Sequence, residues 1–71
     1  MSSATRQWHY VISPLGKCAW VDNGEPAPPW VSEACWYGAV AARTLTEARA
    51  LVEGLRQTRA QRVRDILDSR S

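Results

Sequence analysis

Few residues of this chain could perform acid–base or nucleophilic chemistry. His9 is its one histidine, and Cys18 and Cys35 are its two cysteines. Nucleophilic catalysis needs a thiol or hydroxyl beside a base, and the nearest arrangement is Cys18 with His9. The strand register predicted below puts these two side chains on opposite faces of a sheet. Since the chain also has no Gly-rich phosphate loop and no HExxH motif, we expect neither an enzyme nor a cofactor.

The cysteines do not form a metal-binding pattern. Cys18 and Cys35 lie much farther apart than in a CxxC motif, and only His9 adds a good third ligand, whereas zinc needs four. Free thiols in a reducing cytosol are the expected state, and a disulfide between two strands is the alternative. We therefore predict no metal site.

A cluster of arginines is the next candidate for binding chemistry. Arg56, Arg59 and Arg62 recur at i, i+3 and i+6 with no acidic residue between them. This spacing predicts that they lie along one side of a helix. Three interpretations remain open: a solvated face with pairs such as Glu53–Arg56, a surface that neutralises nucleic-acid phosphates, or a surface that meets an acidic protein.

Two apolar features could contact a partner. Val63, Ile66 and Leu67 continue a helical stripe beyond the expected end of the sheet, so they need a cover from the chain itself, a second subunit or a partner. A homodimer through this C-terminal helix is therefore one prediction. Trp30 follows two prolines in a long loop, where a stiffened indole suits either an interface contact or a lid over the sheet.

The length of 71 residues suffices for one domain, residues 1–71. Four tryptophans and two tyrosines, without any phenylalanine, supply the aromatic mass with which a small domain closes its core. The net charge of +2 excludes neither nucleic-acid nor protein partners. No segment approaches the roughly 20 apolar residues of a membrane span, and residues 1–6 lack the apolar core of a secretory signal. We expect a cytoplasmic protein with no membrane partner.

Residues 7–22 are predicted to form a β-hairpin. The segment Ser13–Gly16 has the signature of a type I turn ending in a left-handed glycine, which predicts a three-residue loop with a bulge. This loop pairs Ser13 with Lys17, so that Tyr10 faces Trp20. The register gathers the aromatic side chains on one face, which we expect to be the core face. That face carries Trp8, Tyr10, Ile12, Cys18 and Trp20, and the other carries His9, Val11, Lys17, Ala19 and Val21.

A proline-rich loop and a third strand are predicted to follow the hairpin. Residues 23–33 combine turn residues with three prolines, which favours an extended loop. Residues 34–43 have the composition of a strand, within which Gly38 indicates a bulge or a close backbone approach.

A long helix is predicted over residues 45–68. Thr44 and Glu47 form a capping box, and apolar residues then recur at helical spacing, so one helix face should pack on the sheet. A break near residue 57 is the alternative, because the apolar stripe lapses after Leu55. The predicted fold is α+β, a three-stranded antiparallel sheet packed on one long C-terminal helix.

The order of hairpin, third strand and capped helix, with the run Glu47-Ala48-Arg49-Ala50-Leu51, resembles short accessory proteins of phages and mobile elements over about residues 7–57. Some of these, the anti-CRISPR proteins among them, occupy a surface of a host defence complex, so the resemblance implies a phage-encoded inhibitor. The absent catalytic set and the surplus of aromatics predict a non-enzymatic protein that binds a partner protein, with nucleic-acid binding through the arginines as the alternative. The predicted partner-binding residues are Trp30, Arg56, Arg59, Arg62, Val63, Ile66 and Leu67.

Overall fold

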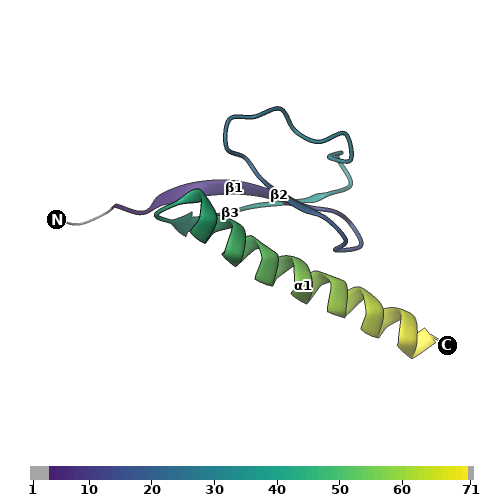
Figure 1. The fold of residues 1–71 in the computed structure, drawn as a ribbon. Helices are drawn as coiled ribbons and strands as arrows, with labels where there is room; N and C mark the ends of the chain where they lie inside the picture. Colours follow the sequence, from purple (N-terminus) through teal and green to yellow (C-terminus); the bar gives the residue numbers. More distant parts are fainter. Residues whose placement is uncertain (1–3, 71) are drawn as a thin grey trace.

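The computed structural model describes residues 4–70 and confirms the predicted α+β fold. Three antiparallel strands form one sheet in the order β2-β1-β3, and a single helix packs along one face of this sheet (Figure 1). A long loop lies on the side of the sheet away from the helix. The elements are β1 (Arg6–Ile12), β2 (Ala19–Val21), β3 (Trp36–Ala42) and α1 (Leu45–Arg70).

Strands β1 and β3 pair over their full length. Tyr10 lies opposite Gly38, and the Tyr10 ring extends across this glycine, where an added Cβ would collide with the ring. Gly38 therefore provides a close approach, one of the two predicted alternatives, and the pairing continues through it without a bulge. β3 begins at Trp36 because a turn in which Cys35 N–H donates to Ser32 C=O occupies the preceding residues.

The predicted register of the hairpin is wrong by one residue. The turn itself is present, since Gly16 N–H donates to Ser13 C=O at 2.9 Å and Gly16 has a φ of 73°. However, the Ser13 hydroxyl accepts from the backbone N–H groups of both Lys17 and Cys18, at 2.9 and 3.0 Å. Lys17 is thereby held in the loop, and strand pairing starts where Ser13 N–H donates to Cys18 C=O.

This register changes which side chains face the helix. Tyr10 pairs with Val21 and Val11 pairs with Trp20, so Trp20 lies on the outer face of the sheet rather than in the core. Cys18, also predicted on the core face, is exposed. The core between sheet and helix consists of Trp8, Ile12, Val21, Ala42, Ala48 and Val52.

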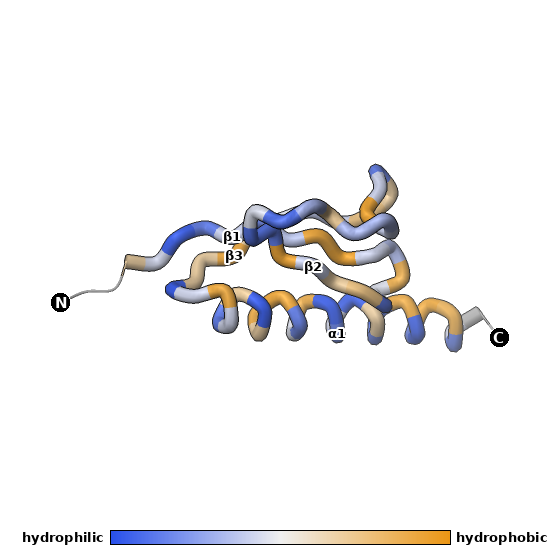
Figure 2. Tube along the Cα trace, turned by 45° about the horizontal axis from the view of Figure 1, so that its top comes forward, coloured by the Kyte–Doolittle hydropathy of each residue, from blue (hydrophilic) through white to orange (hydrophobic). Residues whose placement is uncertain are grey.

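Helix α1 starts at the predicted cap and runs unbroken past residue 57. The N–H of Glu47 donates to the Thr44 hydroxyl at 3.2 Å, and Ala48 and Val52 bury the face that contacts the sheet. Thr58 donates its hydroxyl to Gly54 C=O within the helix, so it does not start a second helix. The last turns of α1 extend past the sheet (Figure 2). Within residues 4–70, no helix is both long and apolar enough to cross a membrane.

The hairpin turn docks directly on the helix. Gly16 is buried, and a Cβ at this position would lie 2.6 Å from the backbone nitrogen of Ala60. The Arg56 Nη1 donates to Gly16 C=O at 2.8 Å. Gly16 is therefore required twice, for its left-handed φ and for the close contact between the turn and α1.

We expect Gly16→Ala to destabilise the domain strongly. The left-handed backbone alone costs about 1–3 kcal/mol for a residue other than glycine, and the Cβ also pushes the turn away from Ala60. Gly24→Ala is the matched control, because Gly24 has a φ of 91° but nothing within 4 Å of an added Cβ. Urea unfolding followed by tryptophan fluorescence measures both. Equal losses for the two variants would contradict a packing role for Gly16.

Candidate functional site

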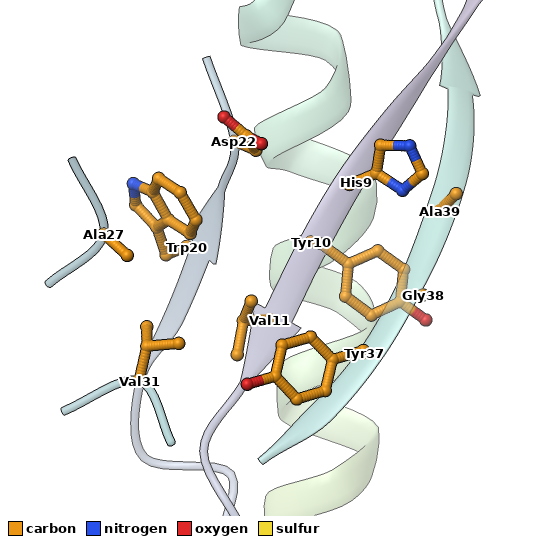
Figure 3. Close-up of a pocket in the computed structure, with 10 residues that line it drawn as sticks. All are labelled: His9, Tyr10, Val11, Trp20, Asp22, Ala27, Val31, Tyr37, Gly38 and Ala39. Atoms are coloured by element: carbon orange, nitrogen blue, oxygen red, sulfur yellow. The ribbon is translucent and has the colours of Figure 1, made fainter. Parts of the chain in front are cut away.

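The outer face of the sheet and the long loop above it form an open hollow. Alternation along the strands brings Val11, Trp20 and Tyr37 onto this face, one from each strand. Together with the loop they enclose an open groove of about 670 Å³, here called the outer groove (Figure 3). It is lined by His9, Tyr10, Val11, Trp20, Asp22, Ala27, Val31, Tyr37, Gly38 and Ala39.

Hydrogen bonds hold the loop over the outer groove. The Tyr37 hydroxyl donates to Ser32 C=O at 2.6 Å, which ties the end of the loop to β3. At the start of the loop, the Asp22 carboxylate accepts from Gly24 N–H at 3.0 Å. The buried Cys35 thiol lies 3.7 Å from the carbonyl of Trp30, to which it donates. The groove is therefore largely formed before anything binds, which lowers the entropy lost on binding.

The lining of the outer groove suits an apolar ligand group. Trp20 and Tyr37 present aromatic surface, with Val11 between them, while His9 and Asp22 lie toward one end (Figure 3). The hydrogen bond between His9 and Asp22 is a backbone one, from Asp22 N–H to His9 C=O, so the imidazole is not oriented as a catalytic base by this contact. Within residues 4–70, no three metal-ligating side chains gather in one place. The arrangement can hold apolar groups by burying them against aromatic rings.

Trp30 does not line the outer groove. It is half-buried in the loop, and its neighbour Val31 reaches the groove in its place. The N–H of Val31 donates to Pro28 C=O at 3.1 Å, so the turn that positions Val31 is built by the prolines next to Trp30. The loop predicted to contact a partner therefore contributes Val31, and not Trp30, to the lining of the outer groove.

The three predicted arginines do not act as one stripe. Arg56 forms a salt bridge with Glu53 at 2.6 Å and also binds the hairpin turn. Arg59 stacks on the Trp36 ring, with its guanidinium carbon 3.7 Å from the ring centroid. Arg62 is exposed beside Arg59.

Arg59 and Arg62 line a second hollow, here called the inner groove, of about 190 Å³ between β3 and the helix. Trp36 and Leu55 also line it, and their side chains are 50% and 41% exposed. Arg59 and Arg62 therefore lie together beside the exposed Trp36 ring. Arg56 instead stabilises the contact between the helix and the hairpin turn.

The apolar end of the helix is partly covered by the hairpin tip. Val63 is half-buried and lines a shallow hollow with Leu67 and with Leu15 from the tip. Ile66 and Leu67 remain exposed, at 53% and 61%. The chain thus folds back over Val63 but leaves the following turn of the helix uncovered.

Comparison with protein-family models, with curated proteins and with solved structures finds no match to this chain. The candidate site therefore rests on geometry. Sequence reasoning missed Trp20, Val31 and Tyr37 as lining residues. The available signal was the alternation of Tyr37, Ala39 and Ala41 in β3, which requires a second, outward face for the sheet.

Protonation of Glu53 should loosen the contact between helix and hairpin. Hydrogen bonds from Arg56 lower the pKa of Glu53 from 4.5 to about 2, against an opposing effect of desolvation, and Gln57 adds a further hydrogen bond. Because the folded-state pKa is depressed, this stabilisation is fully present above about pH 4.5 and is lost as the pH falls through about 2.

We expect Glu53→Gln to be less stable than the wild type at neutral pH, with a difference that diminishes as the pH falls through about 2. Urea unfolding between pH 2 and 7 measures this difference, and added salt should reduce it because the pair is exposed. Glu25→Gln, which removes a loop carboxylate, is the control. A Glu53→Gln deficit that stays constant down to pH 2 would rule out the ion pair as its source.

Proposed function

We propose that this chain is a non-enzymatic binding protein that holds apolar side chains of a partner protein in the outer groove. The observation that carries the proposal is the position of Trp20. A tryptophan that could fill the core of a small domain instead lines an open groove, opposite Tyr37 and under an ordered loop.

The energetics of the outer groove support binding. An aromatic ring can bury roughly 150–250 Å², and Tyr37 is 59% exposed in the isolated chain. Covering Tyr37 and the open side of Trp20 would bury apolar area that the domain does not bury by itself. Tryptophan and tyrosine are also the residues most often found to dominate the binding energy of protein interfaces.

A protein segment is the occupant that fits this groove best. The groove is open along one side, which admits side chains that project from a larger surface. Its polar groups, His9 and Asp22, lie at one end, as in an interface with an apolar centre and a polar rim. Inhibition of a host defence complex stays a prediction, drawn from the resemblance to phage accessory proteins.

Nucleic-acid binding, the alternative, has less support. Glu53 neutralises Arg56, and Arg59 covers one face of the Trp36 ring, on which a base would otherwise stack. Two arginines would contribute a slope of only about −1.4 in a plot of log K against log salt for a single strand.

We expect no measurable binding to single-stranded oligonucleotides at 150 mM salt in a fluorescence anisotropy titration. An affinity that falls steeply with added salt would instead support nucleic-acid binding.

Ala27 is an exposed loop residue that lines the outer groove. We expect a photo-crosslinking amino acid in its place to capture a specific partner from a lysate of the native host. The same amino acid in place of Gln57, on the exposed side of the helix, should not capture it. Calorimetry with the purified partner should then show that Trp20→Ala weakens binding about 30-fold or more, as for a residue that dominates an interface.

Tyr37→Phe tests whether the loop must be held in place. This change keeps the ring but removes the hydrogen bond to Ser32 C=O, so binding should weaken by about 3- to 10-fold. Gln57→Ala should bind normally. Unchanged affinity in Trp20→Ala, or capture from Gln57 as efficient as from Ala27, would show that the partner binds elsewhere.

A further inference from the structure

Among the strands of residues 4–70, β3 has a neighbour on one side only, so its other edge is open. His9 C=O accepts from Asp22 N–H, and Ser13 N–H donates to Cys18 C=O, so odd-numbered residues of β1 direct their backbone groups toward β2. Even-numbered residues of β1 therefore pair with the even-numbered residues of β3 that lie opposite them. It follows that Tyr37, Ala39 and Ala41 direct their N–H and C=O groups away from β1, at the edge of the sheet.

This edge lacks the usual protection against pairing with another strand. Residues Trp36–Ala42 include no charged residue and no proline, and they form a strand of seven residues. The other edge of the sheet, β2, has only three residues. A long uncharged edge strand is a template for a further strand, whereas a very short one is not.

One flank of helix α1 lies beside the same edge. Glu47, Leu51, Leu55, Thr58 and Arg62 recur at i, i+4, i+8, i+11 and i+15, which places them along one side of the helix. Three of them, Leu55, Thr58 and Arg62, line the inner groove next to Trp36 of β3. Leu51 and Leu55 are 46% and 41% exposed. The flank is therefore acidic at its start, apolar in its middle and basic at its end.

The order of charges on this flank is self-complementary. An antiparallel copy of the flank would set Glu47 against Arg62 of the second copy, twice, with the leucines between them. The centre of β3 lies level with these leucines, because Arg59 stacks on Trp36 at one end of β3 and the helix begins shortly after Ala42 at the other. A single two-fold axis can thus relate both the strands and the helix flanks.

We propose that a second copy of this chain pairs with the edge of β3, antiparallel and centred on Ala39, so that the two sheets become one. This register puts Trp36 beside Ala42 of the second copy, and Tyr37 beside Ala41 of the second copy. Each large side chain then meets a small one, and no charges meet on the strands. The interface differs from one through Val63, Ile66 and Leu67, and it leaves the outer groove open in each copy.

Ala39→Pro tests the strand pairing. The Ala39 N–H points away from β1, so a proline at this position removes no hydrogen bond within the sheet. Proline also restricts the backbone angles of the residue before it, and Gly38 tolerates this restriction. We expect the wild type to be a dimer and Ala39→Pro a monomer by light scattering at about 100 μM, with unchanged circular dichroism. Ala39→Ser, which keeps the N–H, should remain dimeric.

A charge exchange tests the helix flank separately from the strand edge. Glu47→Arg and Arg62→Glu should each weaken the dimer about 3- to 30-fold in sedimentation equilibrium, because each replaces two attractive pairs by two repulsive ones. The double variant should restore wild-type affinity. The two residues lie too far apart along the helix to meet within one copy, so restoration requires the antiparallel second copy.

Ile66→Lys distinguishes this interface from the C-terminal end of the helix and should leave the dimer intact. A monomeric wild type at 100 μM would overturn the proposal. A dimer that survives Ala39→Pro but dissociates in Ile66→Lys would also overturn it, in favour of the C-terminal patch.

Discussion

The contact between Gly16 and Ala60 is the constraint on which the rest of this domain depends. The turn can approach the helix backbone only because Gly16 has no side chain, and Arg56 closes the same contact by donating to the Gly16 carbonyl. In the register set by the Ser13 hydroxyl, the β2 residues that face the helix are Ala19 and Val21. Small side chains at these positions allow the helix to lie close to the sheet.

The same register divides the apolar side chains between two faces. Trp8 is the one tryptophan in the cluster of buried residues between sheet and helix. Its indole N–H donates to Ala42 C=O at 3.1 Å, so the hydrogen-bond donor of this buried ring has a partner. Trp20 and Tyr37 are left to the outer face, where the loop covers them only in part. A partner that covered the outer groove, as proposed above, would bury these two rings further.

The sequence predicts what is encoded locally and misses what depends on distant contacts. The Ser13–Gly16 turn, the Thr44 cap and the long helix each have a signal within a few residues, and together they are enough for the fold class. The register required knowing that the Ser13 hydroxyl would hold Lys17 in the loop. The pattern of aromatics favoured the other register, because it assumed that only one face of the sheet would be covered. Arg56 shows the same limit, since its spacing groups it with Arg59 and Arg62 while its carbonyl partner lies in the hairpin.

The two proposed surfaces are compatible, and together they have a consequence for affinity. A two-fold axis through the edge of β3 runs perpendicular to the joined sheet, so both outer grooves open on the same side and both helices lie on the other. A dimer would then offer two identical grooves to one repetitive or dimeric partner, for which the second contact is intramolecular. Such linkage raises the overall affinity by roughly 10²–10⁴ without any new contact, provided that the partner spans both grooves. Through such linkage, a dimer with two shallow grooves would hold a repetitive partner more tightly than a single groove would.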